Sequence, residues 1–119
     1  MTVGDAITAA NSICPNEIED DVKAMWLQNL DGQLILETIN HFDDNDESMP
    51  TYSSDTDNLL VEEPYTEMYV YFLVAQINFY RSEFERYNAN TQMYNEIHDK
   101  WADMYQREHT AKMVKNRWY

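Results

Sequence analysis

The chain has 119 residues and a formal net charge of −14, from 22 acidic and 8 basic side chains. This length suits one domain, and a 44% hydrophobic content excludes a chain that is disordered throughout. The charge excludes a protein that grips nucleic-acid phosphates, which requires clustered Lys and Arg.

The charge is unevenly distributed along the chain. Residues 1–80 contain 16 acids and one base, giving −15, whereas residues 81–119 contain 6 acids and 7 bases, giving +1. Two glycines and three prolines are few for the many turns of a sheet protein, so an all-α fold is expected. A single cysteine suits a reducing compartment. No segment resembles a signal peptide or a membrane span, so we expect a soluble protein made in the cytoplasm.

Two helices are predicted before residue 42. Thr2 and Asp5 have the spacing of a helix cap, which predicts a helix over 3–12 that ends before Pro15. Acids and then apolar residues at helical spacing predict a second helix over 16–41, continuous through Gly32 but with a bend allowed there. Its expected apolar stripe is Ile18, Val22, Met25, Trp26, Leu30, Leu34, Ile35 and Ile39.

Residues 43–63 show no helical period and predict a long exposed loop. Its acids include Asp43, Asp44, Asp46, Glu47, Asp55 and Asp57. We expect some of them to face a channel or a neighbouring subunit and to repel DNA. Residues 59–61 are apolar and are expected to anchor the end of the loop, with a short strand as one form of that anchor.

Two further helices are predicted after the loop. The first spans 65–81 and is apolar on all sides, so it is either central in the fold or buried between subunits; a strand is the local alternative. Ser82 and Glu85 match a capping box, which predicts a break and a helix over 83–107 with an aromatic seam at spacings of three and four. Residues 1–108 form the expected domain, and 109–119 a basic, aromatic tail.

Several side chains could take part in catalysis, metal binding or base stacking, and each is compared with a purely structural role. Cys14 lacks a local partner motif and is interpreted as a buried structural residue, so neither an enzyme nor a cofactor is expected. The acidic loop lacks the calcium-loop glycine at its sixth position, where Ser48 stands, so no metal site is expected. The aromatics lack the basic groove of a base-stacking platform. We assign them instead to core and subunit interface: Tyr69, Tyr71, Phe72, Val74, Tyr87, Tyr94 and Trp101.

The tail is either a frayed terminus or a segment that docks on a partner. If the tail docks on a partner, its cations meet an acidic surface and its aromatic rings fill a pocket. The residues concerned are Lys112, Lys115, Arg117, Trp118 and Tyr119.

The order and spacing of several short motifs resemble the small head-tail connector proteins of tailed bacteriophages and prophages. The resemblance covers about residues 1–108, and no single motif is diagnostic. It departs at Ser82, where glycine is expected, and in the tail. The matching residues are Trp26-Leu27, Leu30-Asp31-Gly32, Leu59-Leu60-Val61, Pro64-Tyr65, Tyr69, Leu73, Gln76-Ile77, Glu83, Arg86-Tyr87-Asn88 and Asn95.

This resemblance implies a four-helix fold with a long loop after the second helix. It also implies a structural virion protein at the head-tail interface: an adaptor that forms a dodecameric homo-oligomeric ring beneath the portal protein. The ring would contact a tail-side connector or stopper protein, and DNA would pass through it without specific binding. In such adaptors the C-terminal segment reorganises and locks onto the portal.

Other functions fit parts of the sequence. An acidic inhibitor that mimics DNA and blocks a nuclease or restriction enzyme would share the charge, but it would act as a monomer or dimer with acids along one face. A third hypothesis is a small regulatory domain that binds an unknown ligand. An enzyme is the least favoured, because no catalytic constellation is apparent.

Overall fold

The computed structural model describes the backbone of residues 1–40 and 48–117, and the side chains within these ranges up to residue 108. Four α-helices run in the order α1 (Val3–Ile13), α2 (Asp20–Leu34), α4 (Glu67–Tyr80) and α5 (Phe84–Arg117), and a π-helical segment, η1 (Ile35–Ile39), continues α2. No strand occurs in these two ranges, only one isolated antiparallel bridge between Thr2 and Asn58. The predicted all-α class is therefore confirmed.

The start of α1 is fixed by the predicted cap. The Thr2 hydroxyl accepts a hydrogen bond from the Asp5 N–H at 3.1 Å, and the Asp5 carboxylate accepts one from the Thr2 N–H at 3.2 Å. Together they satisfy two N–H groups that have no partner inside the helix. Val3, Ala6, Ile7 and Ala10 form the buried face.

The second helix begins at Asp20, so the predicted start at residue 16 is wrong. Asn16 explains the delay, because its side chain accepts from the Ile18 N–H and donates to the Cys14 carbonyl, both within 3.0 Å, which holds the chain in a turn. Helical structure then passes through Gly32 and continues to Ile39 as the π segment. The predicted stripe is only partly right: Met25 is 52% exposed, whereas Lys23, Leu27 and Asp31 are buried.

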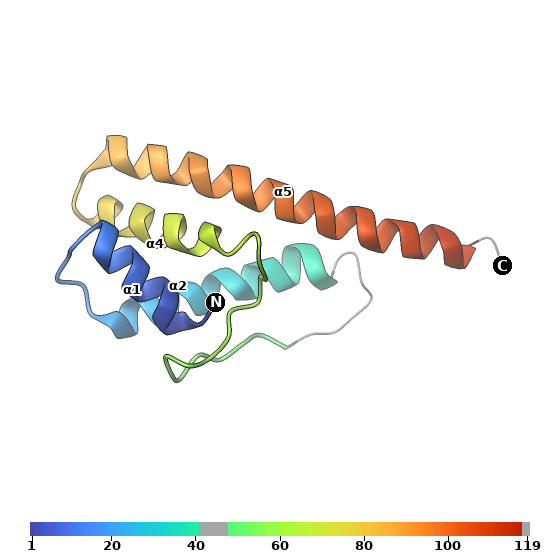
Figure 1. The fold of residues 1–119 in the computed structure, drawn as a ribbon, viewed down its shortest axis with the longest axis horizontal. Helices are drawn as coiled ribbons and strands as arrows, with labels where there is room; N and C mark the ends of the chain where they lie inside the picture. Colours follow the sequence, from blue (N-terminus) through green and yellow to red (C-terminus); the bar gives the residue numbers. More distant parts are fainter. Residues whose placement is uncertain (41–47, 118–119) are drawn as a thin grey trace.

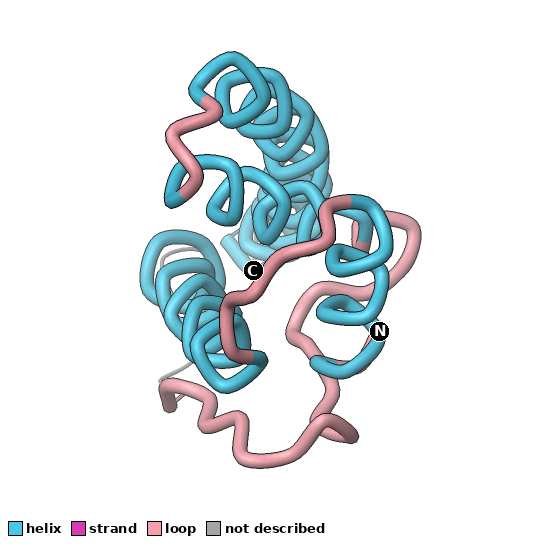
Figure 2. Tube along the Cα trace, turned by 90° about the vertical axis from the view of Figure 1, so that its left-hand side faces the viewer, coloured by secondary structure: helices cyan, strands magenta, loops and turns pink. Residues whose placement is uncertain are grey.

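Helix α4 is the centre of the fold and begins at Glu67, two residues later than predicted. Helices α1, α2 and α5 all pack against it (Figures 1 and 2). This arrangement explains a helix that is apolar on all sides, since the chain's own helices cover it. The residues that it buries are Met68, Tyr69, Val70, Leu73, Val74, Ala75, Ile77 and Asn78.

The turn between α4 and α5 ends one helix and does not cap the next. Ser82 has φ 59°, the left-handed conformation that favours glycine. The Ser82 N–H donates to the Phe79 carbonyl and the Glu83 N–H to the Asn78 carbonyl, which is the hydrogen-bond pattern of a Schellman motif. The predicted capping box is therefore wrong, because an N-cap residue needs an extended backbone.

Helix α5 extends to Arg117, about ten residues beyond its predicted end. It packs along α4 in its first half and then projects past the other helices (Figure 1). The predicted seam is confirmed at Tyr87, Tyr94 and Trp101, which are half-buried or buried, but Phe84 is 55% exposed. The molecule is consequently elongated, 57 by 30 by 20 Å.

Candidate functional site

The predicted core and interface residues divide into two groups. Tyr69, Val74 and Trp101 are inside the core, at most 5% exposed. The other four, Tyr71, Phe72, Tyr87 and Tyr94, are half-buried, and the rings of Phe72 and Tyr94 pack at 5.8 Å. The first group therefore serves mainly as core, and of its three members only Trp101 also lines a surface groove.

A buried hub around Asp31 joins α2, α4 and the connection that precedes α4. The Asp31 carboxylate, fully buried, accepts hydrogen bonds from the Tyr69 hydroxyl at 2.6 Å, the Leu60 N–H at 3.0 Å and the Tyr52 hydroxyl. The Tyr69 oxygen also accepts from the Val61 N–H at 2.8 Å. The hub is not apparent in the sequence, because the partners of Asp31 lie 21 to 38 positions away from it.

Burial controls the electrostatics of this hub. Loss of water raises the pKa of Asp31, although the three donors partly offset the shift. Burial and the neighbouring carboxylate raise the pKa of Tyr52 and of Tyr69, so both hydroxyls remain donors. The arrangement anchors residues 52–61 firmly to the helices.

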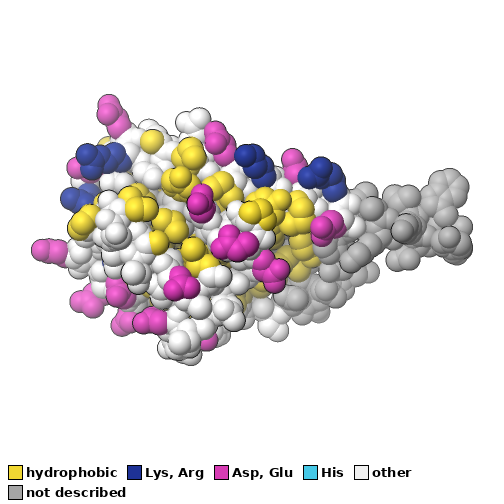
Figure 3. Space-filling model, viewed as in Figure 1, with side chains coloured by type: hydrophobic (Ala, Val, Ile, Leu, Met, Phe, Trp, Pro, Cys, Tyr) yellow, Lys and Arg dark blue, Asp and Glu magenta, His cyan; other side chains and the backbone are white. Residues whose placement is uncertain are grey.

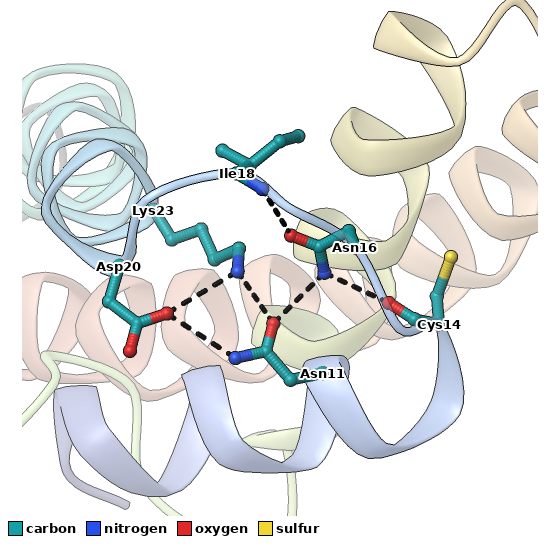
Figure 4. Close-up of polar contacts among 6 residues, drawn as sticks. All are labelled: Asn11, Cys14, Asn16, Ile18, Asp20 and Lys23. Carbon is teal, nitrogen blue, oxygen red and sulfur yellow. Dashed lines mark hydrogen bonds and ion pairs between the residues drawn. The ribbon is translucent and has the colours of Figure 1, made fainter.

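A second hub joins α1 to the start of α2 (Figure 4). Lys23 is 1% exposed, and its ammonium donates to the Asn11 side-chain oxygen at 2.6 Å and to Asp20 at 3.4 Å. Asn16 donates to the same Asn11 oxygen at 3.0 Å. The one base of residues 1–80 is therefore used inside the fold.

The predicted acidic loop is only partly placed. Asp43, Asp44, Asp46 and Glu47 lie outside the described residues. Asp55 is exposed, while Asp57 accepts from the N–H groups of Ser53 and Ser54, within 3.0 Å, and so holds a turn. The N–H groups of Val3 and Gly4 donate to the carbonyls of Asp57 and Asp55 at 2.9 Å, which fastens this turn to α1.

The predicted tail is also only partly placed. Its backbone continues α5 as far as Arg117, so it is not a separate segment from residue 109. The side chains of Lys112, Lys115 and Arg117, and all of Trp118 and Tyr119, lie outside the described residues.

Exposed aromatic rings gather where α4 turns into α5. Phe79, Tyr80 and Phe84 are 48%, 64% and 55% exposed. Tyr80 stacks on Trp26 of α2 at 5.5 Å, and Phe79 packs on Tyr87 at 5.3 Å. We call these five residues the aromatic corner. Exposed aromatics on a rigid turn are typical of protein-binding surfaces.

An apolar groove lies at the other end of the body, where α5 leaves it. It has a volume of about 310 Å³, and carboxylates stand beside its apolar side chains. We call it the α5 groove. Its lining residues are Ile39, Leu60, Glu62, Glu63, Tyr65, Trp101, Met104, Tyr105 and Glu108. Hydrophobic side chains also show between the acids on the face of α4 and α5 in Figure 3.

Cys14 is buried as predicted, and it lies in a polar contact with the end of α4. An Arg81 guanidinium N–H lies 3.4 Å from its sulfur, and the Asn78 side-chain oxygen lies 3.9 Å from it. The same guanidinium donates to the Pro15 carbonyl at 3.1 Å. These contacts hold the α1–α2 connection against α4.

The described residues contain no group of three or more His, Cys, Asp or Glu side chains that could hold a metal ion. No helix among them is long and apolar enough to cross a membrane. Comparison with known protein families, with characterised proteins and with solved structures gave no match.

Proposed function

We propose that this chain is a structural subunit of a phage head-tail connector. In this role it forms a dodecameric ring beneath the portal protein, joins the capsid to the tail-side connector or stopper protein, and lets DNA pass through its centre.

The observation that carries this proposal is where the resemblance residues meet. Asp31, Leu60, Val61 and Tyr69 lie up to 38 positions apart, yet they form one buried hydrogen-bonded hub. These residues carry part of the resemblance and also meet in one network, which supports a shared structural task. Holding a long connection across α2 and α4 is such a task, and it is the feature that the connector resemblance requires.

The aromatic corner supports the assembly part of the proposal. A soluble subunit of this charge gains nothing from three large exposed rings unless a partner covers them. The corner is also rigid, because the Schellman turn and the Trp26–Tyr80 stack fix its shape. A preorganised surface loses less entropy when it binds.

The decisive experiment mixes the chain with a portal protein and measures particle mass by sedimentation. The proposal expects a ring of chains bound to the portal. It is refuted if the chain stays at its 14.2 kDa monomer mass and never co-sediments with a portal. Inhibition of a nuclease by that monomer would instead favour the DNA-mimic alternative.

A matched pair of variants tests the corner itself. Phe84→Ser and Met93→Ser each remove an exposed apolar side chain from α5, 55% and 39% exposed. We expect Phe84→Ser to weaken ring formation about tenfold, as loss of a central aromatic anchor does, with Met93→Ser close to wild type. Equal effects of the two variants would remove the corner from the interface.

A further inference from the structure

We propose that the α5 groove binds the C-terminal segment, residues 109–119, of a second copy of this chain. The inference deepens the proposed function and rests on it for the expectation that copies assemble. It names the surface that is used and the segment that occupies it.

The groove has an apolar floor with an acidic rim. Trp101 and Ile39 are its most buried lining residues, 5% and 7% exposed, and Met104, Leu60 and Tyr65 are half-buried. The exposed side chains of Glu62, Glu63 and Glu108 complete the lining. None of the lining residues is a Lys or an Arg. A peptide segment that fits this groove therefore carries apolar or aromatic side chains together with positive charges.

The C-terminal segment has this chemistry. Residues 109–119 contain Lys112, Lys115 and Arg117 and no acid, and they end in Trp118-Tyr119. Elsewhere the chain is strongly acidic, since residues 1–80 alone carry −15. The segment is the part of the chain best suited to approach a carboxylate rim, because the rest of a second copy would be repelled.

The course of α5 carries most of this segment away from the groove of its own chain. Helix α5 continues from Glu108, at the edge of the groove, to Arg117 without a break. At 1.5 Å per residue this carries the end of the helix about 13 Å beyond the groove. The backbone of Lys115 and Arg117 therefore lies beyond this rim, where a second copy can present its own groove. We therefore assign the contact to two copies and not to a single chain.

Such a contact gives each copy one donor segment and one receptor groove. Contacts of this kind close into a dimer or ring when the geometry allows. They also depend on salt, since exposed charges about 10 Å apart are largely screened above roughly 0.1 M. Self-association that weakens as salt is added is the expected signature.

Charge reversal tests the contact. The tail variant carries Lys112→Glu, Lys115→Glu and Arg117→Glu, and the groove variant carries Glu62→Lys and Glu108→Lys. Glu63 is left intact because its carboxylate accepts from the Thr66 hydroxyl at 2.7 Å. Sedimentation at low salt should show the wild type associating and each variant weakened at least about tenfold. An equimolar mixture of the two variants should recover association, because each reversed segment then meets a reversed rim.

Several results would overturn the inference: a wild type that stays monomeric at every concentration, variants that associate like the wild type, or a mixture that fails to recover while circular dichroism shows both variants folded. If a portal protein captures the wild type and the groove variant equally but loses the tail variant, the segment binds the portal and not a second copy. Conversely, recovery in the mixture without any portal binding would retain this contact and reject the connector role.

Discussion

Replacing Asp31 tests whether the buried hub holds the fold together. Asp31→Ala removes the acceptor for two tyrosine hydroxyls and the Leu60 N–H. Hydrogen bonds to a charged group each contribute about 1.5–3 kcal/mol, but removing the carboxylate also removes its burial penalty. We therefore expect the free energy of unfolding to fall by about 3–5 kcal/mol, a large part of the stability of a domain this size.

The pH dependence of the hub has a definite sign. Burial raises the pKa of Asp31 above its ordinary 3.8, so the folded state binds the proton more tightly than the unfolded state does. The corresponding stability is fully present below the unfolded pKa and is lost as pH rises through the folded pKa. Asp31→Asn cannot titrate. The wild type should therefore lose stability relative to Asp31→Asn as pH rises from about 4, and the difference should level off above the folded pKa.

Urea unfolding followed by tryptophan fluorescence between pH 4 and 8 measures both effects. Asp103→Asn, an exposed acid on α5, is the matched control and should stay within about 0.5 kcal/mol of the wild type. A loss below about 1 kcal/mol for Asp31→Ala would show that the hub is not a main anchor. A wild type that gains stability relative to Asp31→Asn as pH rises would reverse the assigned pKa shift.

Three further predictions use the same unfolding assay or a binding assay. Ser82→Gly relieves a left-handed backbone at φ 59° and should raise the free energy of unfolding by about 1 kcal/mol; a loss would contradict the Schellman assignment. Lys23→Ala removes the shorter of the two hydrogen bonds to the Asn11 oxygen, leaves only the one from Asn16, and should cost about 2–3 kcal/mol, whereas exposed Lys100→Ala should be neutral. Neutralising the loop acids should raise affinity for duplex DNA in fluorescence anisotropy at low salt, and an unchanged affinity would reject their repulsive role. That last variant combines Asp43→Asn, Asp44→Asn, Asp46→Asn, Glu47→Gln and Asp55→Asn.

The helices could be predicted because their signals are local. The α1 cap and the aromatic seam of α5 depend on residues three and four apart, which a sequence shows directly. The predictions were wrong where the end of one helix and the start of the next make different demands on the same residue. Ser82 has the spacing of an N-cap, but the end of α4 requires it in a left-handed conformation, and the preceding helix determines the outcome.

The candidate site was less predictable, because its parts meet only through tertiary contacts. Asp31 and Lys23 are charged residues on the buried side of α2, and a pattern of apolar residues assigns them to the surface. Their partners Tyr52, Tyr69 and Asn11 are 12 to 38 residues away. Likewise, Tyr80 and Phe84 are ordinary members of two helical patterns until the turn brings them to one exposed corner.

The body of the protein should fold without a partner. Helix α4 is covered by the chain's own helices, and no buried side-chain nitrogen or oxygen atom in the described residues lacks a hydrogen bond. In the proposed assembly, the contacts at the corner and the α5 groove are additional to a core that is already complete. The thermal midpoint of the tail variant should accordingly be independent of protein concentration. The equilibrium constant for two-state unfolding of a monomer does not contain the protein concentration. A midpoint that rises with the concentration of that variant, measured by differential scanning calorimetry, would mean that a neighbouring copy is part of the fold.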